Sequence, residues 1–136
     1  MACCCKDEGK MLGLAHIGVM VTDMDKSIDF YQNVVGLELM NVENMGQTRL
    51  AFLKVGSCIL ELVGVAGAQA RPAGVVDHIA IETKNTKAVA QALKAKGVQF
   101  ETEEVSVNEA LMGGVANIFF KGPDGERIEL FEYLNR

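Results

Sequence analysis

The chain has 136 residues, 49% of them hydrophobic and 23% charged, which is the composition of a globular domain with its own core. Its net charge of −5 predicts that it binds neither nucleic acid nor an anionic membrane surface, since both need basic patches. No stretch of the sequence approaches the ~18 consecutive apolar residues of a transmembrane helix.

The first ten residues, MACCCKDEGK, form a polar segment that we expect to be a disordered N-terminal tail. The segment lacks the apolar region of a secretory signal, so the expected location is cytoplasmic. Cys3, Cys4 and Cys5 are adjacent, a spacing that suits neither a disulfide between them nor a structural zinc site. Incidental thiols are therefore the favoured interpretation, and a metal, redox or lipidation role is the alternative.

Two segments that begin with histidine share one pattern: HIGVMVTDMDKSIDFYQNVVGLEL from His16 and HIAIETKNTKAVAQALKAKGVQF from His78. Each is typical of a strand, a polar turn, an amphipathic helix, a glycine and a further strand. We predict helices over residues 25–35 and 86–96. Gly36 and Gly97 then stand where a helix exit favours a left-handed residue.

Three further strands are predicted in each half: GLELMNVE, TRLAFLKVG and SCILELVG, then VQFETEEVSV, VANIFFKG and ERIELFEYL. The order is βαβββ twice, as a module over residues 11–64, a linker over 65–74 and a module over 75–136. Neither half has enough strands to bury a core alone. The predicted fold class is therefore α+β, a single domain over residues 11–136 in which the two modules pair into a partly closed, eight-stranded barrel-like sheet.

Histidine and glutamate recur at matching places in the two modules. His16 and His78 stand in the first strand of each, and Glu61 and Glu129 lie between apolar residues in the last strand of each. Strand alternation turns each glutamate away from its apolar neighbours, and a carboxylate in an apolar strand is costly unless it is paired or bound to a cation. The matched set predicts one metal site. Core histidines with solvent-facing glutamates are the alternative.

Two imidazoles and two carboxylates suit one divalent ion such as Ni²⁺, Co²⁺, Zn²⁺, Mn²⁺ or Fe²⁺. Four protein ligands leave two positions open on an ion that accepts six. Open positions are typical of a catalytic site, where water or substrate binds the ion, rather than of a closed structural site.

The two modules, the opening from His16, the DHIAI segment and the GPDGERIELFE segment resemble the vicinal oxygen chelate superfamily. This superfamily includes glyoxalase I, methylmalonyl-CoA epimerase, fosfomycin resistance proteins and ring-cleaving dioxygenases, and the resemblance covers residues 12–133. It implies metal ligands from the first and last strands of each module, which are His16, Glu61, His78 and Glu129. It also implies a metal-dependent lyase or isomerase that moves a proton through a metal-stabilised enediolate or enolate, with Glu129 as ligand and catalytic base and Glu61 as its catalytic counterpart.

The chain departs from the glutathione-dependent glyoxalases at two positions. Those enzymes have an arginine four residues after the first ligand and an asparagine four residues after the second, where this chain has Met20 and Val65. We therefore expect a different small-molecule substrate: a thioester, a hemithioacetal or a hydroxy-carbonyl compound. Arg49 and Arg71 are candidate replacements or ordinary surface arginines. Glu43 is a weaker candidate for the additional glutamate of the epimerases.

Two other functions stay open. A fosfomycin-type thiol transferase uses two histidines and one glutamate, so Glu61 counts against it. A non-catalytic protein that binds a small molecule such as an antibiotic lacks the ligand set that this chain has. A homodimer is expected, with the metal site either within one chain or swapped between two. Phe52, Phe119 and Phe120 are interpreted as packing residues.

Overall fold

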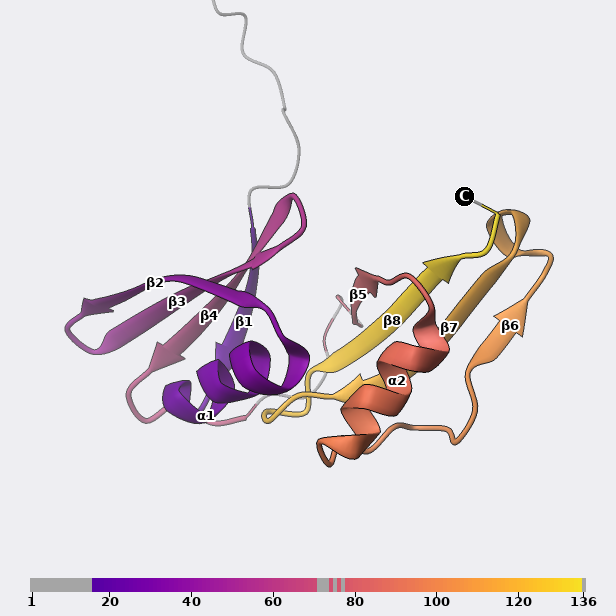
Figure 1. Cartoon of the computed structure of the whole chain (residues 1–136). Coiled ribbons are helices and arrows are strands. Elements are labelled where there is room, and N and C mark those ends of the chain that lie inside the picture. Colours follow the sequence, from indigo (N-terminus) through magenta and orange to yellow (C-terminus); the bar gives the residue numbers. More distant parts are fainter. Residues whose placement is uncertain (1–15, 71–73, 75, 77, 136) are drawn as a thin grey trace, which may run out of the picture.

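The computed structural model describes residues 16–70, 74, 76 and 78–135. The predicted N-terminal tail with Cys3, Cys4 and Cys5, and also Arg71, lie outside these residues. Within them, eight strands form two four-stranded mixed sheets that lie apart from one another (Figure 1). The predicted α+β fold with two βαβββ modules is confirmed.

The first module has the sheet order β1-β4-β3-β2, with β1 parallel to β4. Its elements are β1 (Ile17–Val21), α1 (Met24–Asp29), the π-helix η1 (Phe30–Val35), β2 (Glu38–Met45), β3 (Thr48–Val55) and β4 (Cys58–Val65). The second module repeats this plan in the order β5-β8-β7-β6, with β5 parallel to β8. Its elements are β5 (Ile79–Glu82), α2 (Thr86–Ala95), β6 (Ser106–Asn108), the short 3-10 helix η2 (Leu111–Gly113), β7 (Val115–Lys121) and β8 (Arg127–Tyr133).

Both helical segments begin and end within one residue of the predicted bounds. Asp23 caps α1 by accepting a hydrogen bond from the Lys26 N–H, and Asn85 caps α2 by accepting one from Ala88. The exits at Gly36 and Gly97 both have φ of 90°, a conformation that favours glycine. The first helix differs from expectation in its second half, which is a π-helix rather than α-helix. None of the helices in the described residues is long and apolar enough to cross a bilayer.

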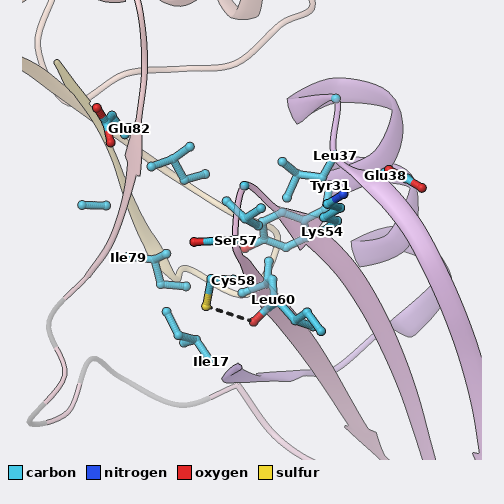
Figure 2. A pocket seen from close by; sticks show the side chains of 16 residues that line it. Ile17, Tyr31, Leu37, Glu38, Lys54, Ser57, Cys58, Leu60, Ile79 and Glu82 are labelled. Carbon is cyan, nitrogen blue, oxygen red and sulfur yellow. Dashed lines mark hydrogen bonds between the residues drawn. The ribbon is translucent and has the colours of Figure 1, made fainter. Parts of the chain in front are cut away.

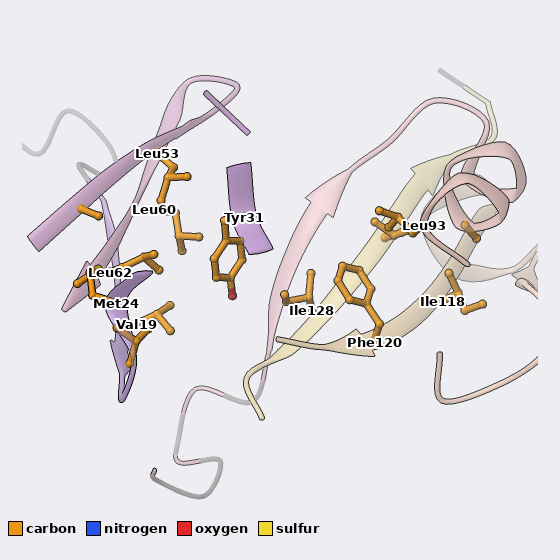
Figure 3. Packing of buried hydrophobic residues seen from close by; sticks show 14 residues of the cluster. Val19, Met24, Tyr31, Leu53, Leu60, Leu62, Leu93, Ile118, Phe120 and Ile128 are labelled. Carbon is orange, nitrogen blue, oxygen red and sulfur yellow. The ribbon is translucent and has the colours of Figure 1, made fainter. Parts of the chain in front are cut away.

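One hydrophobic cluster joins the two modules. Each module packs its helix against its own sheet, and buried residues of both modules belong to this one cluster. Figure 3 shows Tyr31 between Leu60 of the first module and Ile128 of the second. Phe30 of η1 adds a ring contact to Phe120 of β7, with centroids 6.3 Å apart. The modules of one chain are therefore held together through η1.

Polar contacts at the turn between β7 and β8 complete this junction. The Tyr31 hydroxyl donates to Glu126 Oε1 at 2.7 Å, and the Thr22 hydroxyl donates to Asp124 Oδ1 at 2.6 Å. Burial raises the pKa of Glu126 above its ordinary value, although the hydrogen bond from Tyr31 opposes that rise. Burial and the neighbouring Glu126 likewise raise the pKa of Tyr31. The junction thus contains a neutral phenol hydrogen-bonded to a partly buried carboxyl group.

Candidate metal centre

His16 and Glu61 form a close pair on the sheet face that points away from the core of the first module. Alternation in β1 sends Val19 and Val21 into the core, so His16 projects from the other face. Glu61 lies opposite Gly18 in the register of β1 and β4, between the buried residues Leu60 and Leu62. His16 Nε2 is 2.8 Å from Glu61 Oε2. We call this pair the first half-site.

His78 and Glu129 form the same arrangement in the second module. His78 Nε2 is 3.0 Å from Glu129 Oε2, and the Glu129 side chain is only 7% exposed. The other carboxylate oxygen, Oε1, accepts a hydrogen bond from Asn117 Nδ2 at 2.7 Å. The His78 ring makes an edge contact with Phe119, with centroids 5.5 Å apart. We call His78 and Glu129 the second half-site.

A phenylalanine lies directly across from each glutamate in the neighbouring strand. Phe52 of β3 is paired with Glu61, and Phe119 of β7 is paired with Glu129. Interpreting both rings as core packing was therefore incomplete, whereas Phe120 is fully buried and does belong to the core. The sequence contains a signal for this position opposite the glutamates, because a phenylalanine recurs in the third strand of both modules.

The two half-sites do not meet within one chain. They belong to different sheets, and no group of three or more His, Cys, Asp or Glu in the described residues is placed to hold one ion. The structure thus brings together the predicted ligands two by two: His16 with Glu61, and His78 with Glu129. One chain therefore presents two separate pairs of one nitrogen and one oxygen.

Each pair has a geometry that fits a divalent ion. Donor atoms about 2.1 Å from an ion and at right angles to each other are about 3.0 Å apart. The measured separations of the nitrogen and oxygen donors are 2.8 and 3.0 Å. Imidazole and carboxylate are also the donors that borderline ions accept. Each half-site therefore fits two neighbouring coordination positions of a metal ion.

The other sequence candidates divide between the two faces of the first sheet. Glu43 of β2 is paired with Leu50 of β3, on the face that carries Glu61, and its carboxylate accepts a hydrogen bond from Asn41 at 3.0 Å. Arg49 lies on the opposite face and pairs with Asp25 at 3.2 Å. Arg49 thus points away from the first half-site.

A cleft of about 570 Å³ separates the two modules. It is lined by parts of β1, β4 and β5, and Ile17, Cys58 and Ile79 approach one another across it (Figure 2). Ile17 and Ile79 are the residues that follow the two histidines. Both β1 and β5 are edge strands, each hydrogen-bonded on one side alone within the described sheets. The cleft therefore combines apolar side chains with unpaired strand edges.

Comparisons with known proteins agree with this architecture. A family profile, "Glyoxalase/Bleomycin resistance protein/Dioxygenase superfamily", matches residues 13–130. The chain is 34% identical over 127 residues to a "Probable lactoylglutathione lyase" of Vibrio parahaemolyticus, covering 88% of this chain and 89% of that one. It is 32% identical over 122 residues to the "Uncharacterized protein YwbC" of Bacillus subtilis, covering 86% and 94%.

Among solved structures, the chain is similar to SMU.1112c, with a TM-score of 0.77 and 28% sequence identity. The match covers 90% of this chain and all of that one. The profile match, the paired βαβββ modules and the repeated His–Glu pairs lead to one conclusion. The chain belongs to the glyoxalase/bleomycin resistance protein/dioxygenase superfamily.

Proposed function

We propose that the protein is a divalent-metal-dependent isomerase or lyase that removes a proton from carbon of a small carbonyl substrate and returns it to carbon through an enediolate or enolate. Its metal ligands are His16, Glu61, His78 and Glu129. The observation that carries this proposal is the matched geometry of the two His–Glu pairs, each within 3.0 Å on equivalent strands. The similarity to the Vibrio protein, which is named a probable lactoylglutathione lyase, supports the same reaction class.

We propose further that the metal centre forms between two chains of a homodimer. In that arrangement, His16 and Glu61 of one chain face the partner subunit's His78 and Glu129. The open edges of β1 and β5 support this assembly, because unpaired strand edges readily add another strand. The apolar cleft beside those edges supports it as well, because Ile17 and Ile79 would lose solvent contact. Two chains related by a twofold axis would form two such centres.

The roles of the side chains follow from their chemistry. His16 and His78 would hold the ion through imidazole nitrogens, and Glu61 and Glu129 would hold it through carboxylate oxygens. When bound, the ion would supply Lewis-acid stabilisation of negative charge on a substrate oxygen. Glu61 or Glu129 takes the proton from the substrate carbon beside the carbonyl group. In a hemithioacetal the proton returns to the adjacent carbon, and in a branched thioester it returns to the opposite face of the same carbon. Phe52 and Phe119 line the site and limit access of water to it.

The proposed substrate is a thioester, a hemithioacetal or a hydroxy-carbonyl compound, and need not carry glutathione. The positions that would hold the glutathione carboxylates contain Met20 and Val65. Arg49 is turned to the other face of the sheet and paired with Asp25. Strand alternation places Lys54 of β3 on the same face of the first sheet as Glu61. Among the described residues of this sheet face, Lys54 is the positively charged side chain available to a substrate anion.

The test combines metal analysis with an isomerisation assay. Purified protein is expected to hold about one Ni²⁺, Co²⁺, Zn²⁺, Mn²⁺ or Fe²⁺ ion per chain by elemental analysis. It should also isomerise at least one of two probes, the hemithioacetal of methylglyoxal and a 2-methyl-branched acyl thioester. His16→Ala and Glu129→Ala should lose both properties, and Glu103→Gln, an exposed carboxylate elsewhere, should keep both.

Other outcomes separate the remaining functions. Metal binding with thiol addition to an epoxide such as fosfomycin, and no isomerisation, would identify a transferase. Wild-type protein that stays free of metal after these ions are offered would contradict the enzyme proposal. A small-molecule binding protein would then be the better interpretation.

A further inference from the structure

The two half-sites differ in what holds their carboxylates. Both oxygens of Glu129 have a partner, Asn117 Nδ2 on Oε1 at 2.7 Å and His78 Nε2 beside Oε2 at 3.0 Å. Among the described residues the Glu61 carboxylate has one polar partner, His16, and the Glu61 side chain is 15% exposed against 7% for Glu129. One carboxylate is therefore anchored at both oxygens, and the other is held at one.

The strand registers explain this difference. Asn117 precedes Phe119 by two residues on β7, and Phe119 is paired with Glu129. In the first module Leu50 stands two residues before Phe52, which is paired with Glu61. Residues two apart in a strand share a face, so Leu50 occupies the place that Asn117 has in the second module. A leucine side chain has no N–H to donate, so the first module lacks this anchor.

We propose that Asn117 is a positioning residue that fixes Glu129 as a permanent metal ligand binding through Oε2 alone. Glu61, without such a donor, is then the carboxylate that is able to leave the ion when substrate binds. The inference rests on the proposed metal-dependent function and adds that the two carboxylates have different roles at the ion. A hydrogen bond to the non-ligating oxygen fixes the carboxylate orientation, so the side chain loses less conformational freedom when the ion binds.

The experiment measures Co²⁺ affinity by competition with a chelator and records the visible spectrum of the bound ion. Asn117→Leu gives the second module the side chain of the first and should weaken Co²⁺ binding about 10- to 100-fold. Leu50→Asn makes the reciprocal change and should tighten binding about three- to tenfold. Asn33→Leu removes an amide that donates to Asp29 at 2.7 Å in the first helical segment, away from both half-sites, and is the matched control.

A double-mutant cycle shows whether Asn117 acts through Glu129. In a Glu129→Gln background, Asn117→Leu should change Co²⁺ affinity by less than about twofold, because the carboxylate that it positions is already absent. Urea unfolding of each metal-free variant separates a loss of fold from a loss of ligand positioning. A Co²⁺ spectrum that shifts in Asn117→Leu, and stays unchanged in Asn33→Leu, would support the same conclusion.

The contrary outcomes are distinct. Wild-type protein that binds no Co²⁺ would overturn the proposed function and this inference with it. Wild-type protein that binds Co²⁺ no more tightly than Asn117→Leu would overturn the inference alone. The inference would also be overturned if Asn117→Leu reduced Co²⁺ affinity as much in the Glu129→Gln background as in wild type. Asn117 would then act on metal binding through another residue than Glu129.

Discussion

The two modules show how far a repeated sequence pattern determines a site. Both place a histidine beside a glutamate on the outer face of a parallel strand pair, with a phenylalanine opposite the glutamate. The second copy adds Asn117, and Arg127 lies over the Phe119 ring at 3.8 Å while also pairing with Glu101 at 2.8 Å. The repeat therefore provides the histidine–glutamate pair twice, and the second pair has additional polar and ring contacts around it.

The largest expected effect separates the two glutamates. Glu129→Ala should weaken metal binding by more than about 100-fold. This loss is larger than the loss expected when a residue that only hydrogen-bonds to a metal ligand is replaced. Glu61→Ala should weaken it less, because Glu61 has fewer contacts to lose. Isothermal titration with Zn²⁺ measures both losses. Equal losses in the two variants would remove the proposed difference between the half-sites.

The next effect concerns the junction and should leave both half-sites intact. Tyr31→Phe removes the hydroxyl that donates to the partly buried Glu126 carboxylate. We expect a loss of about 1–3 kcal/mol in the free energy of unfolding, because a buried acceptor loses its donor. Urea denaturation measures the loss, and metal content should stay unchanged. A parallel loss of metal would show that the junction and the half-sites are coupled.

The pH dependence of stability gives a smaller effect that also belongs to the junction. Burial raises the folded-state pKa of Glu126, so its contribution to stability is fully present below its ordinary pKa. That contribution is lost as pH rises through the raised pKa. Glu126→Gln should remove this decline from the free energy of unfolding measured over a pH series. A pH profile that is the same in Glu126→Gln and in wild type would contradict the assignment of this decline to Glu126.

Glu132 gives the smallest effect, with the opposite sign. Hydrogen bonds from the backbone N–H groups of Thr86 and Asn85 lower the pKa of its carboxyl group. Its contribution is therefore present above the ordinary pKa and is lost as pH falls through the lowered one. Glu132→Gln should cost less than about 1 kcal/mol at neutral pH, because the residue is only partly buried and solvent screens its charge. Thermal unfolding at neutral and acidic pH measures this contribution.

Much of the fold follows from local sequence patterns. The two histidine-led repeats predict the βαβββ order. The helices begin after the capping residues Asp23 and Asn85 and end at Gly36 and Gly97. Alternation around Glu61 and Glu129 predicts that each faces away from the core. These features depend on short-range periodicity and backbone preference, which a single sequence displays directly.

The neighbours of the half-sites could not be predicted in the same way. Asn117 is 12 residues from Glu129 along the chain, and only the register of β7 and β8 brings its amide to the carboxylate. The separation of the two half-sites likewise depends on how the modules pack, through Tyr31 and the β7–β8 turn. Such long-range contacts leave no periodic pattern in the sequence.

A complementation experiment tests the two-chain metal centre most directly. His16→Ala and His78→Ala proteins, each expected to bind no Co²⁺ at a buffered concentration that saturates wild type, are unfolded together and refolded as a mixture. Half of the dimers should then be mixed, and each mixed dimer has one centre with both histidines intact, so about a quarter of the wild-type Co²⁺ binding should return. A mixture that binds no more Co²⁺ than either variant alone would contradict a centre shared between chains.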